Sequence, residues 1–256
     1  MVPDSGGDGD SDDSPNAESP PDAESPPDAE SPPNAESPPD AESPVGVERP
    51  TDPDVPPPGV PTDRLADWTR TEATVERLYG VEGADVRGHT LVYEDRRLRE
   101  GVRDATDGSL DQSWRFFFAT RLRFRPPLSP GAHVAILPTV RSEAVRAFRR
   151  DLEDRGVDAV ERGRRERVRT DSGKRARLRQ VTGEIPRPDA SAGSDEPIPI
   201  EGWVGVWYDG DFLVAGGAYP RTSLARAFDV DDDRLALSSS AARDDLLELL
   251  QAVSGD

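Results

Sequence analysis

Alternation of polar and apolar residues is the clearest pattern along the chain, and it predicts mainly β-strands. Residues 84–95 (ADVRGHTLVYED) and 113–124 (SWRFFFATRLRF) each alternate over most of their length. Residues 160–185 and 199–220 each contain two such runs around a short turn, which is typical of a β-hairpin. The short apolar run 133–138 (HVAILP) predicts one further strand.

Helical spacing of apolar residues occurs in fewer places. Residues 139–156 and 238–253 each place their large apolar residues on one face and predict amphipathic helices. Residues 63–79 lie near helical spacing, although the second half, 73–79, fits a strand as well. Residues 94–102 predict a short helix.

These elements predict an α+β fold, because strands outnumber helices and neighbouring strands are joined by short turns. We expect a mainly antiparallel sheet with two or three helices packed on one face. Residues 62–256 contain every Trp, Tyr and Phe and are long enough for a single domain. Within it, the polar segment 186–197 predicts a mobile loop.

The first part of the chain differs in kind. Residues 1–61 hold 16 Asp or Glu residues, one basic residue (Arg49) and 17 of the 26 prolines. Residues 14–39 repeat a hexapeptide of the type Pro-Pro-Asp/Asn-Ala-Glu-Ser. Such a segment buries too little apolar surface to offset its ordering entropy, so residues 1–61 should form a disordered, acidic, Pro-rich tail. It would act as a solubilising spacer or as a ligand for a proline-binding partner.

Composition excludes several kinds of protein. The chain has no cysteine, which rules out disulfides, thiolate metal sites and cysteine nucleophiles. It has no apolar run near the ~20 residues of a membrane helix and no signal-peptide pattern at its start, so we expect a cytoplasmic protein.

No catalytic, cofactor or metal motif is evident. GxSxG, a P-loop and a GxGxxG after a strand do not occur, and His89 and His133 lack metal-ligand spacing. The acidic run 229–233 (DVDDD) begins like a calcium loop but lacks its glycine and closing glutamate. The sequence therefore favours a protein without enzymatic activity, metal or cofactor.

The hairpin of residues 160–185 carries the most distinctive polar pattern. Arginines occupy alternate positions on both of its strands and would share a face of each strand: Arg165, Arg167, Arg169, Arg175, Arg177 and Arg179. This arginine ladder could bind phosphates or nucleic acid by bidentate contacts, pair with neighbouring carboxylates, or dock an acidic partner. The acidic tail is one such partner, in transient contact at low salt. No aromatic residue interleaves with the arginines, as single-strand binders usually require.

The second hairpin is rich in aromatic residues. With a two-residue turn at Asp209-Gly210, Trp203, Trp207 and Phe212 would share one face. They would form part of the core, or they would line a shallow apolar pocket.

Three strings, VRGHTLVYED, WRFFFATRLRF and GWVGVWYDGDFLVAGGAYP, resemble those of an uncharacterised family of haloarchaeal proteins. The resemblance covers about residues 65–252 and brings no known function. Composition is similar to that of proteins from salt-loving archaea, since 31 of the 32 basic residues are arginine and only Lys174 is lysine.

These observations favour a non-catalytic cytosolic binding or accessory protein of a halophile, with an unknown partner. The alternative is a nucleic-acid- or phosphate-binding protein that uses the arginine-rich hairpin 162–179. A hydrolase based on paired carboxylates is the least supported interpretation.

Overall fold

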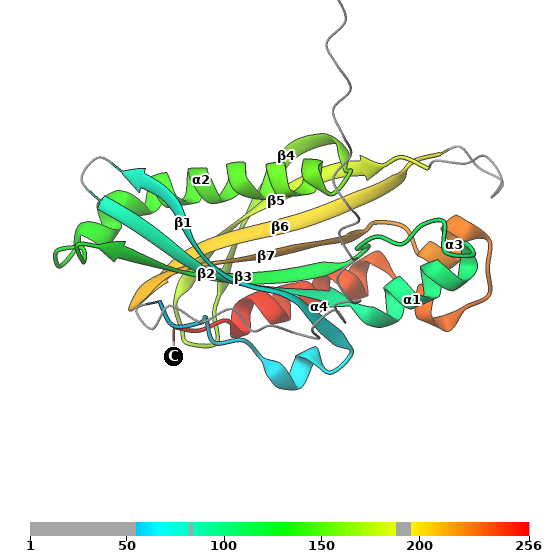
Figure 1. Cartoon of the computed structure of the whole chain (residues 1–256), viewed down its shortest axis with the longest axis horizontal. Coiled ribbons are helices and arrows are strands. Elements are labelled where there is room, and N and C mark those ends of the chain that lie inside the picture. The colour runs from blue at the N-terminus through cyan, green and yellow to red at the C-terminus, as the bar shows by residue number, and fades with distance from the viewer. Residues whose placement is uncertain (1–54, 82–83, 188–195, 256) are drawn as a thin grey trace, which may run out of the picture. The chain divides into compact units, whose positions relative to one another are not determined.

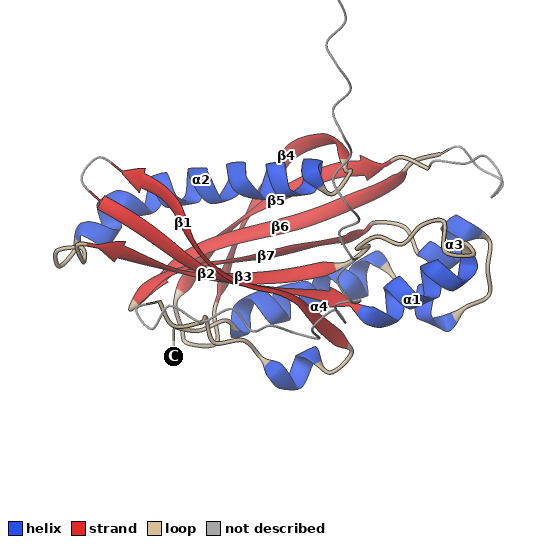
Figure 2. Cartoon of the chain, in the orientation of Figure 1, coloured by secondary structure: helices blue, strands red, loops and turns tan. Residues whose placement is uncertain are grey.

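The computed structural model describes residues 55–81, 84–187 and 196–255. Its centre is one sheet of seven antiparallel strands in the order β1-β2-β3-β7-β6-β5-β4 (Figures 1 and 2). The strands are β1 (Trp68–Val81), β2 (Ala84–Asp95), β3 (Phe116–Arg125), β4 (Asp158–Arg169), β5 (Arg175–Ile185), β6 (Ile198–Asp209) and β7 (Asp211–Pro220). The predicted α+β class with a mainly antiparallel sheet is confirmed.

The sheet is assembled from two sets of consecutive strands. β1, β2 and β3 pair in chain order, and so do β4, β5, β6 and β7. The last strands of the two sets, β3 and β7, pair with each other and join the halves. Helix α2 (Ala132–Asp154) carries the chain from β3 to the far edge at β4, and it lies across one face of the sheet on the way (Figure 1).

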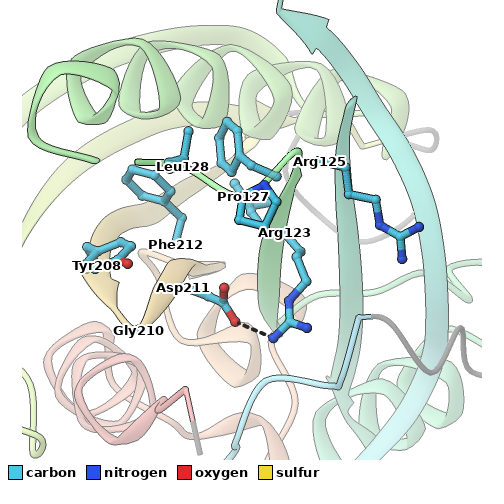
Figure 3. A pocket seen from close by; sticks show the side chains of 10 residues that line it. Arg123, Arg125, Pro127, Leu128, Tyr208, Gly210, Asp211 and Phe212 are labelled. Carbon is cyan, nitrogen blue, oxygen red and sulfur yellow. Dashed lines mark hydrogen bonds and ion pairs between the residues drawn. The ribbon is translucent and has the colours of Figure 1, made fainter. Parts of the chain in front are cut away.

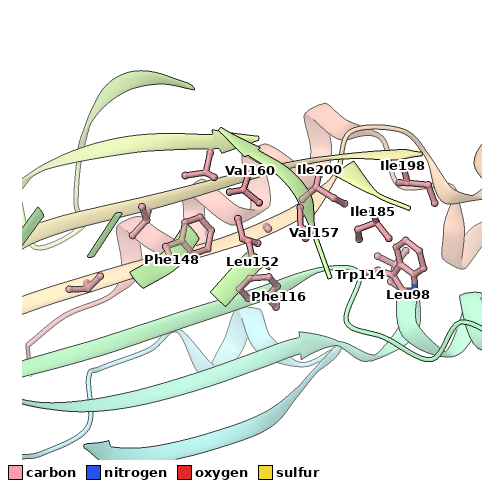
Figure 4. Close-up of a cluster of buried hydrophobic side chains, with 14 of the residues drawn as sticks. Leu98, Trp114, Phe116, Phe148, Leu152, Val157, Val160, Ile185, Ile198 and Ile200 are labelled. Atoms are coloured by element: carbon pink, nitrogen blue, oxygen red, sulfur yellow. The ribbon is translucent and has the colours of Figure 1, made fainter. Parts of the chain in front are cut away.

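Helices cover both faces, so the expectation of a single covered face is wrong. On one face, Phe148 and Leu152 of α2 are buried close to Phe116 (Figure 4). On the other face, helix α4 (Ser239–Ala252) buries Leu246 and Leu250 in a second core that contains both buried tryptophans of β6. Central strands that are apolar on both sides need a cover on each side, because each exposed apolar face would cost free energy.

Two short helices and a 3₁₀ turn complete the fold at one end of the sheet. They are α1 (Arg96–Ala105), α3 (Leu224–Phe228) and η3 (Asp233–Leu235). The side chain of Asp95 caps α1 by accepting from the Leu98 amide at 3.0 Å. Ser238 caps α4 in the same way through the Ala241 amide at 3.2 Å.

Most predicted elements are found, and two are corrected. Residues 63–79 form only a 3₁₀ turn, η1 (Thr62–Leu65), followed by the long edge strand β1. The predicted strand 133–138 is instead the start of α2. Gly131, with φ of 83°, precedes the helix and marks the true break in the chain, while Pro138 lies inside the helix.

The folded part begins before residue 62. Val55 is fully buried, and its carbonyl oxygen lies 2.9 Å from Nδ1 of His89. Gly59 pairs with Ser254 through two backbone hydrogen bonds of 3.0 Å. Residues 55–61, assigned to the tail from composition, therefore pack on the domain; residues 1–54 and most of the loop 186–197, namely 188–195, lie outside the described residues.

Candidate anion-binding cleft

The arginine ladder forms on a single face of the β4–β5 hairpin. Strand register places Arg165 opposite Arg179, Arg167 opposite Arg177, and Arg169 opposite Arg175. Each pair is a cross-strand neighbour, and successive pairs are about 6.6 Å apart along the strands. The two rows of arginines therefore lie on the same face of the hairpin.

The N-terminal half of α2 converts part of this ladder into a cavity of about 840 Å³, which we call the arginine cleft. From α2 it is lined by Pro138, Arg141, Ser142 and Val145, and the side chains of Val204 and Val206 form its floor. Leu178 also borders the cavity, but its side chain packs in the core on the other face of the sheet. Six guanidinium groups surround it: Arg141, Arg162, Arg165, Arg167, Arg177 and Arg179. Arg169 and Arg175 belong to the ladder but do not line the cleft.

An irregularity in β4 explains why Arg162 faces the same cleft as the arginines of the ladder. The register of β4 against β5 shifts between Arg162 and Arg165, so residues three apart face the same side. At Gly163 an added Cβ would lie 2.5 Å from Oε1 of Gln180, so a larger residue there would displace the Gln180 side chain. The bulge is held by Arg179, which donates from Nη1 to the Gly163 carbonyl at 3.0 Å.

The positive charge of the cleft is not neutralised from within. Among the residues that the structure describes, none of the six arginines forms an ion pair with a carboxylate. Glu166 contributes to the lining, but Arg243 of α4 holds its carboxylate at 2.8 Å. The interpretation in which the ladder pairs with neighbouring carboxylates therefore has no support in the described contacts.

Burial and mutual repulsion both act on these groups. Burial, followed by repulsion from Arg177, lowers the pKa of Arg141 below its ordinary value. Burial, followed by repulsion from Arg165 and Arg162, lowers the pKa of Arg179. Arg141 also has a buried Nε with no hydrogen-bond partner in the described part of the chain. Such a cluster has donors in excess and is suited to an anion with several acceptor oxygens.

In a second arginine-lined cavity, by contrast, a carboxylate neutralises the arginine charge. It measures about 550 Å³ and lies where the β6–β7 turn meets the end of β3 (Figure 3). Arg123 is directed toward Asp211, whose carboxylate it meets at 3.3 Å, and Arg121 meets the same carboxylate at 2.7 Å. These ion pairs tie β3 to β7, so this cavity has a structural explanation that the arginine cleft lacks.

The predicted aromatic face of the second hairpin is corrected. Trp207 pairs with Leu213, and Phe212 pairs with Tyr208, so Phe212 lies on the opposite face from Trp203 and Trp207. Asp209 pairs with Asp211 around Gly210, whereas the expected two-residue turn would have paired the strands one residue out of step. All three side chains are at most 1 % exposed and belong to the two cores. They do not form one pocket.

The remaining polar candidates have structural roles. His89 is buried against Val55, and His133 lies in α2 rather than in a strand, with its ring stacked on Tyr208 at 4.1 Å. In the acidic run, Asp232 is bound to Arg234 at 2.7 Å. Across the described ranges, no cluster of three or more His, Asp or Glu residues is arranged to hold a metal ion.

Sequence reasoning found four of the six cleft arginines and missed two. Arg162 could not be predicted as a cleft residue because it faces the cleft only through the bulge in β4. Arg141 could not be predicted because its place depends on where α2 crosses the sheet. The only signal for Arg141 was its position beside Val140 and Val145 on a predicted helix, which does not say which strands that helix covers.

Fold and site together define a protein of the α+β class with an antiparallel sheet and an arginine-lined cleft beneath one helix. The family described as Domain of unknown function (DUF6517) matches residues 57–254, and the chain belongs to this family. Neither the curated proteins nor the solved structures include a match to the chain. No helix in the described part is long and apolar enough to cross a membrane.

Proposed function

We propose that this chain is a non-catalytic binding protein whose ligand is a phosphate-bearing polyanion held in the arginine cleft. One observation carries the proposal: six guanidinium groups line a single cavity and have no carboxylate partner among the described residues. Keeping like charges together costs free energy in the ligand-free protein, and a polyanion would repay it through charge-assisted, bidentate hydrogen bonds.

Recognition would depend on the anionic groups of the ligand rather than on stacking of aromatic rings. Among the described residues, the lining of the cleft contains no Phe, Tyr or Trp on which a base could stack. The ladder continues beyond the cleft through Arg169 and Arg175 to the tip of the hairpin. An elongated phosphate chain, including a nucleic-acid backbone, is therefore the second candidate beside a compact polyphosphate.

Composition supports the setting in which we place this function, the cytosol of a halophilic archaeon. The chain combines 51 acidic residues with almost exclusive use of arginine over lysine. At ~1 M salt the screening length falls to about 3 Å, so long-range attraction of a ligand would be weak. Guanidinium–phosphate contacts inside a cavity act at hydrogen-bond distance and would persist under these conditions.

The acidic tail is a further proposed partner of the same site. Residues 1–54 carry 16 acidic residues and one basic residue, and a segment tethered to the domain has an effective concentration on the order of millimolar. We infer that the tail competes weakly for the cleft at low salt and that other polyanions displace it.

The proposal is tested by titrating the full chain with sodium tripolyphosphate and with a ten-residue oligothymidylate by calorimetry at about 0.1 M salt. The variant Arg167→Ser/Arg177→Ser removes two cleft arginines, and Arg96→Ser/Arg103→Ser removes two exposed arginines of α1. With about 1.5 kcal/mol for each lost charge-assisted hydrogen bond, the cleft variant should bind on the order of 100-fold more weakly. Equal weakening in both variants, or no binding by the wild type, would refute the proposal.

A further inference from the structure

A third cavity lies on the same face of the sheet, beside the C-terminal half of α2. It measures about 500 Å³ and is bounded by α2 and by strands β1, β2 and β3. In Figure 1, β1 rises from the sheet toward α2 at this side of the molecule. We call this cavity the apolar cleft. Its residues are separate from those that line the arginine cleft.

The floor of the apolar cleft follows from cross-strand register. Val92 of β2 lies opposite Phe118 of β3, and Thr90 lies opposite Thr120, with a hydrogen bond of 2.9 Å between the two hydroxyl groups. Further apolar lining comes from Phe116, Leu122, Ala144, Ala147, Phe148 and Val214. Because the two threonines satisfy each other, the floor presents mainly apolar surface.

Leu78 marks the mouth of this cleft. It is 39 % exposed and is one of two large apolar side chains that stand exposed in the described part, the other being Val134. Leu78 lies over Gly88 of β2, where an added Cβ would collide with it. An exposed leucine at the edge of an apolar cavity indicates a surface that a ligand would cover.

The rim of the cleft carries unbalanced negative charge on β1. Glu72 and Glu76 share the inner face of this strand with Leu78, and neither has an ion pair among the described contacts. Glu72 accepts a hydrogen bond from the Thr74 hydroxyl at 3.0 Å.

On the α2 side, the acidic residues are already neutralised. Glu143 is paired with Arg146 at 2.8 Å, and Asp151 is paired with Arg155 at 3.0 Å. Arg150 is the one further cation of this rim, and it projects from the helix rather than from β1. A cationic group of a ligand would therefore be attracted to the β1 rim.

We propose that the apolar cleft binds a small organic cation, with its apolar body on the floor and its amino group between Glu72 and Glu76. The volume lies within the range of about 300–1,000 Å³ that is usual for small-molecule sites. Burial of the apolar body, which also covers Leu78, drives association, and the two carboxylates select for positive charge. The site is independent of the polyanion site proposed above.

Three probes with the same chain length test this assignment: decylamine, decanol and decanoate, each below its micellar concentration, titrated into the full chain by calorimetry. Wild-type protein should bind decylamine at least about 10-fold more tightly than decanoate, with decanol between them. The variant Glu72→Gln/Glu76→Gln should reduce decylamine affinity to that of decanol and leave decanol unchanged. The matched control Glu100→Gln/Glu184→Gln changes two exposed glutamates elsewhere and should have no effect.

Two further variants test the apolar part. Leu78→Ser removes the leucine at the mouth, and Ala147→Trp fills the cleft from an exposed position on α2, so both should weaken all three probes. Circular dichroism establishes that each variant is folded. The proposal is overturned if decanoate binds as tightly as decylamine, or if Ala147→Trp leaves the three affinities unchanged. The variant Arg167→Ser/Arg177→Ser should bind decylamine normally, which separates failure at this site from failure at the arginine cleft.

Discussion

Replacing Arg177 by glutamine should make the ligand-free protein more stable, although most substitutions destabilise a protein. Arg177 lies directly opposite Arg167, and its charge also lowers the pKa of Arg141 in α2. Its side chain forms no ion pair or hydrogen bond in the described part of the chain. Glutamine keeps a polar side chain of somewhat shorter reach and removes the charge.

The magnitude follows from Coulomb's law. Two unit charges about 6 Å apart repel by about 0.7 kcal/mol in water and by somewhat more beside a protein surface. Arg177 has two such neighbours but is exposed, so most of the interaction is screened, and a net gain of about 0.5–1 kcal/mol is reasonable. For a domain of this size, that gain raises Tm by about 1–4 °C.

The assay is thermal unfolding at about 20 mM and about 1 M NaCl, with Arg121→Gln as the comparison. Arg121 is paired with Asp211 at 2.7 Å, so its replacement leaves this carboxylate with only the more distant Arg123, at 3.3 Å, and should lower stability by about 1–3 kcal/mol. The gain from Arg177→Gln should vanish at 1 M, where the screening length is about 3 Å. A lower Tm for Arg177→Gln at 20 mM, or a gain that persists at 1 M, would refute the claim that the cleft arginines repel one another.

Three further predictions concern other parts of the chain. Deleting residues 1–54 should tighten tripolyphosphate binding about 3- to 10-fold at about 20 mM salt and not at 1 M, measured by calorimetry, because the proposed competitor is removed. Gly216→Ala should strongly lower Tm, since an added Cβ would lie 2.7 Å from the ring of Phe118 and 2.6 Å from a backbone oxygen. Burial, and then the hydrogen bond to Glu201, raise the pKa of Tyr219 above its ordinary value of 10.0. The unfolded chain therefore loses this proton first, and stability should fall as pH rises above about 10, an effect that Tyr219→Phe should reduce in pH-dependent unfolding curves.

The arginine ladder could be predicted from the sequence because side chains alternate between the two faces of a strand wherever no bulge interrupts it. Alternation of Arg165, Glu166 and Arg167 already places the arginines on one face of the strand. The cavity could not be predicted, because it exists only where α2 crosses this face. That crossing depends on the strand order, which places β4 at the edge and brings β3 beside β7.

The errors have equally specific causes. β1 is an edge strand whose residues from Thr69 to Thr71 are exposed on both faces, so burial imposes no alternation there and chance helical spacing was misleading. For the same reason, the sequence did not predict Glu72 and Glu76 as site residues. They can be recognised as such only once the position of α2 beside β1 is known. In the β6–β7 hairpin, a difference of one residue in the turn moved Phe212 to the other core, because side chains alternate between faces.

Helix α2 separates two clefts whose charges are opposite, and this separation has a physical consequence. Excess arginine lies on the β4–β5 side and excess glutamate on the β1 side, and the helix and its buried face keep the two sets from neutralising each other. A chain selected for stability alone could have exchanged these charges or replaced them with neutral residues, as the paired arginines beside Asp211 illustrate. Unpaired charges of both signs, each beside a cavity, are what we expect if the two ligands proposed above supply the missing counter-charge.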